Sequence, residues 1–478
     1  MKEYVAPAGS IPTLDVPDLS AVRAVHLVGI GGAGMSGLAR LLLARGVRVS
    51  GSDLKESPPL IQLRIAGADV HVGHDAAHLG SPDAVVVSTA IPGSNPEVAE
   101  GRRRGVPVLA RAQVLAALMR ERRGVAVSGT HGKTSTTSML AVILERAGLD
   151  PTYLVGGDLN ESGSNARSGD GELFVAEADE SDGSFLLLEP EIAVVTNVED
   201  DHLDFYPSRE DIEAAFAAFC RRAGTIVACA DDPGARRVVD AAEVPVVWYG
   251  YAPDATVRIE DPVVSVEGSR AVLRTMPPAF VPWSGELVFP VPGRQYLANA
   301  AGAVAAAARI GVPPADTVSA LTGFGGVRRR WERRGAVRGA EFVDDYAHHP
   351  TEIEATLAAA RTDGGRRVVA VFQPHRYSRT AALWRQLGES LAGADVIVIT
   401  DVYGAGELPV PGVTGKLLVD ALAESAPGRR AVYLPRRGDV APFLAREVRP
   451  GDLVLTLGAG DITMVGEEAM ALLRGPDG

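Results

Sequence analysis

The chain has 478 residues, of which 46% are hydrophobic and 22% charged, and this ordinary composition excludes a disordered or fibrous protein. Its length exceeds what one hydrophobic core supports, so we expect roughly two to four domains and take three as the working hypothesis. The formal net charge of −13 argues against a nucleic-acid binder, because phosphate backbones are held mainly by Lys and Arg.

The cysteine content and the N-terminus indicate the compartment. Cys220 and Cys229 are too few for a disulfide framework, and we expect both to be buried thiols. No basic segment followed by a long apolar run opens the chain, and the apolar stretches are the length of strands. We therefore predict a cytoplasmic protein that does not insert into the membrane, either a monomer or a weak homodimer.

The first part of the chain predicts a Rossmann-like domain over residues 1–122. A strand at 25–28, a helix at 35–45 and a strand at 47–50 form a β-α-β unit, and another strand at 84–87 leads into a loop. The turn has the pattern G-x-G-x-x-G, and Asp53 lies 53 − 34 = 19 residues after its last glycine. The pattern indicates a diphosphate at a helix N-terminus, which either NAD or a sugar nucleotide satisfies.

The second part predicts a P-loop ATPase-type domain with a mostly parallel sheet over residues 123–332. We expect strands at 125–128, 173–176 and 192–196, helices at 135–147 and 298–310, and an antiparallel extension at 254–292. The segment Gly129-Thr130-His131-Gly132-Lys133-Thr134 lies between a strand and a helix, where backbone N–H groups can cradle a triphosphate. Lys133 is expected to reach the β and γ phosphates, and the Thr134 hydroxyl a Mg²⁺ ion. Val127 stands where the usual phosphate-loop pattern has a glycine.

Two acidic segments follow consecutive predicted strands of this domain. The first runs from Glu177 to Asp182, and the second begins at Asn197 and includes Glu199, Asp201 and His202. Because parallel strands end at one edge of a sheet, both segments should flank the phosphate loop. Mg²⁺ needs only one or two protein carboxylates, so the segments predict a phosphate-bound metal.

The third part predicts a second Rossmann-like domain over residues 333–478, with strands at 368–372, 396–400 and 453–457. The segments 344–350 and 373–380 are both expected to be loops that follow strands. Arg376 and Arg379 form a candidate fork for a carboxylate, as guanidinium geometry favours. His348 and Asp345 are candidates for positioning a nucleotide or an amine.

The ordered motifs resemble those of the Mur ligases of peptidoglycan synthesis over nearly the whole chain. They are HLVGIGGAGMSGLA from His26, GTHGKTSTT from Gly129, EADESDGSF from Glu177, TNVEDDHLDFY from Thr196, FGGVRRRW from Phe324, DDYAHHPTEI from Asp344, FQPHRYSRT from Phe372 and GAGDI from Gly458. The resemblance implies three α/β domains and an ADP-forming ligase that joins L-alanine to UDP-N-acetylmuramate through an acyl phosphate, with ATP and Mg²⁺.

The resemblance also implies roles for individual residues. Lys133, His202 and His348 are the expected catalytic residues; Thr134, Glu177 and His202 the metal-linked residues; and His348, Arg376 and Arg379 the amino-acid side. The expected ATP-binding residues are Gly129, Thr130, His131, Gly132, Lys133, Thr134, Ser135, Asn299, Arg330 and Asp345. Those expected to bind the UDP-sugar are Gly29, Gly31, Gly32, Gly34, Met35, Asp53, Ser88, Thr89 and Ala90.

Several alternatives remain open at this point. The first glycine loop also fits an NAD-dependent oxidoreductase, and the same loops would serve a nucleotide-gated sensor without catalysis. Within the family, the first loop is similar to that of the L-alanine-adding branch; the nearer alternative is the recycling branch, which attaches a preformed peptide to the same sugar nucleotide. Gln295 and Tyr296 depart from the family's His and Asn, and Trp331 from its Phe.

Overall fold

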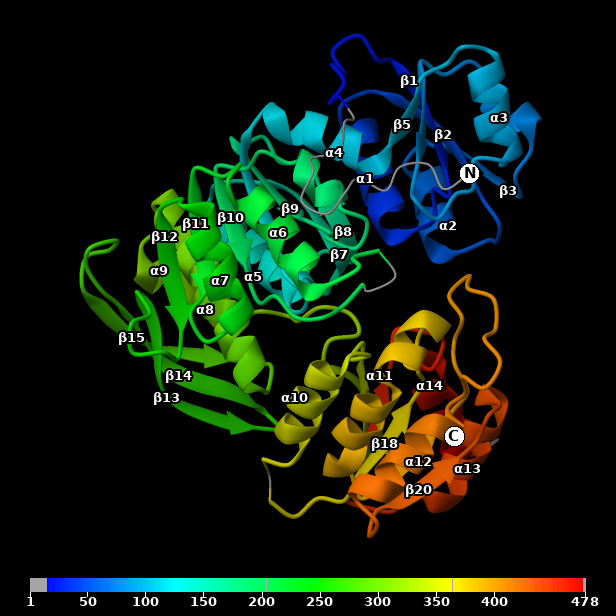
Figure 1. The fold of residues 1–478 in the computed structure, drawn as a ribbon, viewed down its shortest axis with the longest axis vertical. Helices are drawn as coiled ribbons and strands as arrows, with labels where there is room; N and C mark the ends of the chain where they lie inside the picture. Colours follow the sequence, from blue (N-terminus) through cyan, green and yellow to red (C-terminus); the bar gives the residue numbers. More distant parts are fainter. Residues whose placement is uncertain (1–14, 203–204, 363, 476–478) are drawn as a thin grey trace.

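The computed structural model describes residues 15–202, 205–362 and 364–475. They form three sheets, each covered by helices, which follow one another along the chain from blue through green to red in Figure 1. The α/β architecture predicted from the sequence is confirmed. Among the described residues, no helix is long and apolar enough to cross a lipid bilayer.

The first sheet has five parallel strands in the order β3-β2-β1-β4-β5. Because β1 lies between β2 and β4, the strand order reverses beside it, and in such sheets ligands bind in the crevice at the carboxyl ends of these two strands. The elements are β1 (Ala24–Val28), α1 (Ala33–Ala44), β2 (Arg48–Asp53), α2 (Pro58–Ile65), β3 (Asp69–Val72), β4 (Ala84–Val87), α3 (Pro96–Arg103), β5 (Val108–Ala110) and α4 (Arg111–Arg120).

The central sheet has ten strands in the order β15-β14-β13-β12-β11-β10-β6-β9-β7-β8. Its middle is parallel, whereas β13–β15 and the β7–β8 hairpin pair antiparallel at the two ends. The strands are β6 (Arg123–Ser128), β7 (Thr152–Leu159), β8 (Ser164–Arg167), β9 (Leu173–Glu177), β10 (Ile192–Val195), β11 (Thr225–Cys229), β12 (Val246–Gly250), β13 (Val257–Ser265), β14 (Gly268–Thr275) and β15 (Trp283–Phe289); the helices are α5 (Lys133–Arg146), α6 (Arg209–Cys220), α7 (Pro233–Ala242), α8 (Arg294–Ile310) and α9 (Pro314–Thr322).

The helix α5 is buried along most of its length because it lies between the sheet and α8. The alanine-rich face of α8, from Ala300 to Ala307, allows this close approach. This packing fixes the N-terminus of α5, which carries the phosphate loop, against the centre of the sheet. Cys220 and Cys229 are free and buried as predicted, and burial raises the pKa of both thiols to about 12.

The third sheet has the order β16-β17-β21-β18-β19-β20 and is parallel except for the β16–β17 hairpin. Its elements are β16 (Glu332–Val337), β17 (Ala340–Asp345), α10 (Pro350–Ala360), β18 (Val368–Phe372), α11 (Tyr377–Ser390), β19 (Val396–Ile399), α12 (Lys416–Ser425), β20 (Arg430–Tyr433), α13 (Val440–Glu447), β21 (Leu453–Leu457) and α14 (Thr463–Arg474).

Two sequence-based expectations about element boundaries are wrong. The segment 373–380 is not all loop, because α11 already begins at Tyr377 and Arg379 lies in its first turn. The helix expected at 298–310 begins four residues earlier, at Arg294, after Gly293 with φ +130°. In each case the residue just before the helix has a positive φ, Gly293 (+130°) before α8 and Arg376 (+68°) before α11, so the loop ends within one residue. Residue composition does not reveal such a turn.

Candidate active site

The phosphate loop lies at the carboxyl end of β6, in the middle of the central sheet. Val127, which occupies the consensus glycine position, is a buried residue of β6, so the loop proper begins at Gly129. The neighbouring strand β10 holds the loop in place: the Asn197 side chain accepts a hydrogen bond from the His131 N–H (2.8 Å) and donates one to its carbonyl (3.0 Å). Sequence reasoning assigned Asn197 only to an acidic segment and missed this structural role.

Lys133 lies at the start of α5 with its ammonium group turned into the loop. Its Nζ donates to the carbonyls of Gly129 (2.6 Å) and Thr130 (3.3 Å) and to Glu180 Oε1 (2.8 Å). Burial alone would lower the pKa of Lys133, but the surrounding carboxylates, led by Glu180, raise it above its ordinary value. A permanently charged ammonium group therefore stands where a polyphosphate would lie against the loop.

The first acidic segment faces the phosphate loop as predicted. The Thr134 hydroxyl donates to Glu177 Oε1 (3.1 Å), and the other Glu177 oxygen accepts the Gly156 N–H (2.7 Å). Burial raises the pKa of Glu177 despite the nearby Lys133. His202 lies close by, with its Nε2 3.5 Å from Glu180 Oε1. The structure thus brings the expected metal-linked residues Thr134, Glu177 and His202 to one edge of the sheet.

The second acidic segment departs from its expected role. Glu199 and Asp201 do not face the Thr134–Glu177 pair but reach across to the C-terminal domain. Asp201 accepts a two-pronged hydrogen bond from Arg379 (3.1 Å), and Glu199 Oε2 accepts one from the Thr351 hydroxyl (2.7 Å). This segment therefore joins two domains, which the spacing of acidic residues could not reveal.

Asn299 on α8 lies directly beside the phosphate loop. A Cβ atom at Gly132, which has φ +80°, would stand 2.5 Å from Asn299 Oδ1. The glycine is therefore needed both for its backbone conformation and for the space that Asn299 occupies. The structure thus places this expected ATP-side residue against the loop.

Asp345 and Arg330 sit where the C-terminal domain meets the central domain. The Asp345 carboxylate is buried and accepts the N–H groups of Trp331 (2.8 Å) and Ala347 (2.9 Å), and burial raises its pKa to about 6. The hydroxyl of Tyr296, one of the departures from the family pattern, donates to the same carboxylate (3.4 Å). Asp345 thus fixes the loops around the site rather than facing open space.

Arg330 and His348 both contact Glu352 on α10. Arg330 Nη1 lies 3.4 Å from Glu352 Oε1, and its guanidinium group stacks over the Tyr346 ring at 5.1 Å. His348 Nδ1 lies 2.9 Å from the Tyr346 carbonyl. Burial lowers the pKa of His348 to about 3, so the ring is neutral, with Nδ1–H donated and Nε2 left as an acceptor.

A small cavity of about 190 Å³ opens between the central and C-terminal domains. It is lined by polar residues from both sides, among them His202, Arg376 and Arg379. The predicted Arg376–Arg379 fork is only partly realised, because Arg379 is engaged by Asp201 while both side chains border the cavity. The structure therefore gathers His202, an expected metal-linked residue, and the two arginines expected on the amino-acid side around one cavity.

The first domain presents its glycine loop at the crevice between β1 and β4. The Gly31 N–H donates to Asp53 Oδ2 (2.9 Å), so this carboxylate shapes the loop from within. Ser88, Thr89 and Ala90 follow β4 on the other side of the crevice, and a Cβ at Gly29 would touch Ile91 of that loop at 3.1 Å. Met35 is 2% exposed and packs in the core, so its side chain does not face the crevice.

Arg111, which the sequence did not single out, lies between the first glycine loop and the central domain. A Cβ at Gly34 would stand 2.6 Å from its Nη1, and its Nη2 lies 3.7 Å from the Asp179 carboxylate in the central domain. Arg111 thus connects the first glycine loop with the acidic segment beside the phosphate loop. Its position just after the short strand β5 carried no motif that would have identified it.

The central domain has the arrangement of a phosphate-loop nucleotide-binding protein: a strand leads through a glycine loop into a buried helix, and carboxylates face the loop. This domain lies between two further α/β domains along the chain. Three family profiles match the chain in order: "Mur ligase family, catalytic domain" at residues 24–123, "Mur ligase middle domain" at 127–307, and "Mur ligase, glutamate ligase domain" at 329–460.

The chain is also similar to whole proteins of this family. It is 48% identical to a UDP-N-acetylmuramate–L-alanine ligase of Rubrobacter xylanophilus, over 94% of this chain and 100% of that protein. Among solved structures, it matches a UDP-N-acetylmuramate–alanine ligase of Thermotoga maritima with TM-score 0.78 and 30% identity, covering 93% and 98% of the two chains. A murein peptide ligase of Psychrobacter arcticus matches with TM-score 0.70 and 26% identity over 95% and 99%. The chain belongs to the Mur ligase family.

Proposed function

We propose that this chain is an ATP-dependent ligase that joins L-alanine to the lactyl carboxylate of UDP-N-acetylmuramate and releases ADP and phosphate. The observation that carries the proposal is the shared cavity, where His202, from the side of the phosphate loop, and two arginines of the C-terminal domain meet. Its volume of about 190 Å³ suits a small amino acid. The full-length likeness to relatives named for this reaction supports the same substrates.

The chemistry requires activation of the carboxylate, because its charge is delocalised and oxide is a poor leaving group. A carboxylate oxygen attacks the γ-phosphorus of ATP, ADP departs, and an acyl phosphate forms. The neutral amine of L-alanine then attacks the acyl carbon, phosphate leaves, and the nitrogen loses one proton to become the amide N–H. Lys133, charged and buried in the phosphate loop, would offset charge on the transferring phosphoryl group. Arg330 is proposed to assist from the C-terminal domain.

The residues beside the loop fit a Mg²⁺ ion. The Thr134 hydroxyl lies 3.1 Å from Glu177 Oε1, and the buried Glu180 Oε2 has no hydrogen-bond partner. A hard cation suits such oxygens and keeps several waters, and His202, expected from the family resemblance, would lie beside it. When bound, the cation would neutralise phosphate charge. Thr134 and Glu177 would hold it and thereby fix the triphosphate against the N-terminus of α5.

The amino-acid side is assigned to the shared cavity. Arg376 and Arg379 would hold the carboxylate of L-alanine, since guanidinium groups bind carboxylates in two-pronged geometry. The neutral His348 offers Nε2 as an acceptor and would orient the attacking amine. His202 is less suited to this task in the present arrangement, because Glu180 and Asp201 outweigh its burial and raise its pKa.

The first domain is assigned to UDP-N-acetylmuramate. Gly29 to Gly34 at the N-terminus of α1 would hold the diphosphate, with Ser88, Thr89 and Ala90 on the opposite wall of the crevice. Arg111, between this loop and Asp179, would lie near the path of the substrate towards the ATP site. We place the enzyme in the cytoplasm, where ATP and sugar nucleotides occur, and expect a monomer or weak homodimer by light scattering.

A coupled assay of ADP release tests the proposal. We expect ADP and phosphate only when UDP-N-acetylmuramate and L-alanine are both present, and loss of this activity in Lys133→Ala. ATP turnover that is indifferent to the sugar nucleotide would refute the ligase. A preference for a preformed peptide over L-alanine would assign the recycling reaction instead, absorbance changes of a nicotinamide cofactor an oxidoreductase, and tight ATP binding without turnover a sensor.

A further inference from the structure

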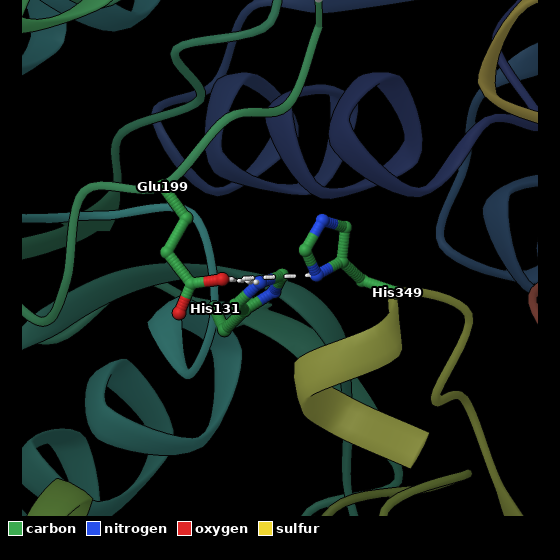
Figure 2. Close-up of side chains that lie close together, drawn as sticks. All are labelled: His131, Glu199 and His349. Carbon is green, nitrogen blue, oxygen red and sulfur yellow. Dashed lines mark ion pairs between the residues drawn. The ribbon is translucent and has the colours of Figure 1, made fainter. Parts of the chain in front are cut away.

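Three side chains, none of them among the proposed Mg²⁺ residues, converge at the junction of the central and C-terminal domains. His131 lies in the phosphate loop, Glu199 follows β10, and His349 immediately precedes α10. One ligand atom from each lies within 4.8 Å of the other two. Figure 2 shows the Glu199 carboxylate directed at both imidazole rings, which come from segments far apart in the chain.

Three of the four ring nitrogens of this cluster are buried and have no hydrogen-bond partner. His349 is 6% exposed, and neither of its nitrogens has a hydrogen-bond partner; the same holds for His131 Nε2. Buried polar atoms in proteins are nearly always paired, so such a group needs an explanation. Here both unpaired rings face one carboxylate oxygen, Glu199 Oε2, at 3.6 Å from His131 Nε2 and 3.8 Å from His349 Nδ1.

We infer that His131, Glu199 and His349 form a binding site for a divalent transition-metal cation of the Zn²⁺ and Co²⁺ type. Ligand atoms about 2.0–2.1 Å from a tetrahedral ion lie about 3.3 Å from one another, only a few tenths of an ångström closer than the two measured separations. Two imidazoles and one carboxylate suit zinc or cobalt and not Mg²⁺, which prefers oxygen ligands. A water molecule would take the fourth position.

The surroundings support the ligands as they do in known metal sites. Glu352 Oε1 lies 3.4 Å from His131 Nδ1 and would accept its N–H, which directs Nε2 to the ion. The Thr351 hydroxyl donates to Glu199 Oε2 (2.7 Å) and orients that carboxylate. His349 is already neutral, because burial lowers its pKa to about 4, whereas His131 would release a proton to solvent on binding.

The cation would tie two domains together. His131 and Glu199 belong to the central domain, and His349 to the C-terminal domain. Binding would favour the arrangement in which α10 approaches the phosphate loop. The site shares no residue with Thr134, Glu177 and His202, and so does not depend on the proposed ligase reaction.

Titration of the nucleotide-free full chain with Co²⁺, after treatment with a chelator, tests the site through the visible absorption of the bound ion. We expect one saturable ion per chain with the spectrum of four- or five-coordinate Co²⁺, which an excess of Mg²⁺ does not displace. His349→Ala and Glu199→Gln should each weaken binding by about 100-fold or more, and Glu352→Gln by about 10- to 100-fold.

Two controls keep the outcome decisive. Glu199→Gln preserves the size of the side chain and an acceptor for Thr351, so loss of the signal in this variant does not follow from misfolding. His78→Ala removes a histidine from a separate group around Glu97 in the first domain and should leave the signal unchanged. Absence of a saturable signal, a signal that survives in His349→Ala, or one lost in His78→Ala would overturn the inference.

Discussion

Replacing Gly132 with alanine tests how closely the phosphate loop depends on Asn299. The new Cβ would stand 2.5 Å from Asn299 Oδ1, and an ordinary contact begins at 3.4 Å, so the side chain must retreat by 3.4 − 2.5 = 0.9 Å. In addition, alanine at φ +80° costs about 1–2 kcal/mol of backbone energy. If Asn299 helps hold the nucleotide, a displacement of this size should weaken binding by up to about 100-fold.

Gly46 provides a matched control, because it has φ +77° but no atom within 4 Å of the added Cβ. We expect Gly46→Ala to lose only the backbone energy in urea unfolding, and Gly132→Ala to lose at least as much, because its Cβ also displaces Asn299. Only Gly132→Ala should lose affinity for a non-hydrolysable ATP analogue in isothermal titration, and the double variant Gly132→Ala/Asn299→Ala should bind no more weakly than Asn299→Ala alone. Equal analogue affinity in Gly132→Ala and Gly46→Ala would refute the assigned role of Asn299.

Three further variants probe other parts of the molecule. Glu177→Gln should raise the melting temperature of the nucleotide-free protein, because burial raises the pKa of Glu177 and so disfavours its charged form. The same variant should lower the rate of ADP release by about 100-fold, and an unchanged rate would contradict the proposed role of Glu177. Burial by itself would raise the pKa of Glu97, but hydrogen bonds with His26 and Ser52 lower it from 4.5 to about 2. The charged carboxylate therefore stabilises the folded protein at pH 7, and Glu97→Gln should lower the free energy of unfolding by about 3 kcal/mol. This contribution is present above pH 4.5 and is lost as the pH falls towards 2, so a urea-unfolding difference that does not shrink over that window would count against it. Arg379→Ala should raise the KM for L-alanine. It should also increase the radius of gyration in small-angle scattering, because Asp201 would remain buried without its partner, at a cost of up to about 3–5 kcal/mol. The radius of gyration of Arg379→Ala/Asp201→Ala should increase less than that of Arg379→Ala. An unaltered scattering profile in the single variant would show that the Arg379–Asp201 ion pair does not hold the two domains together.

Much of the fold could be predicted from the sequence because buried parallel strands are continuous apolar runs. The strands at 84–87, 368–372 and 453–457 lie as predicted, since both faces of each are covered. The hairpins β7–β8 and β16–β17 were not predicted. Their residues are polar or charged at many positions, and their pairing is set by contacts with the rest of each sheet rather than by local pattern.

Local sequence is enough to show which chemical groups stand at the strand ends: the ammonium of Lys133, the carboxylate of Glu177 and the glycines of two turns suited to phosphate. These depend on local geometry, because a strand, a tight turn and a helix N-terminus fix them within a few residues. Which of these groups lie next to one another depends on how the domains pack. In the sequence, Glu199 and Asp201 read as ligands of a phosphate-bound Mg²⁺ ion, but domain packing turns them to Thr351 and Arg379 and sets Glu199 beside the rings of His131 and His349. A carboxylate interacts with whatever groups lie near it in space, whatever their distance along the chain. Its role therefore depends on the cation or imidazole that packing places beside it.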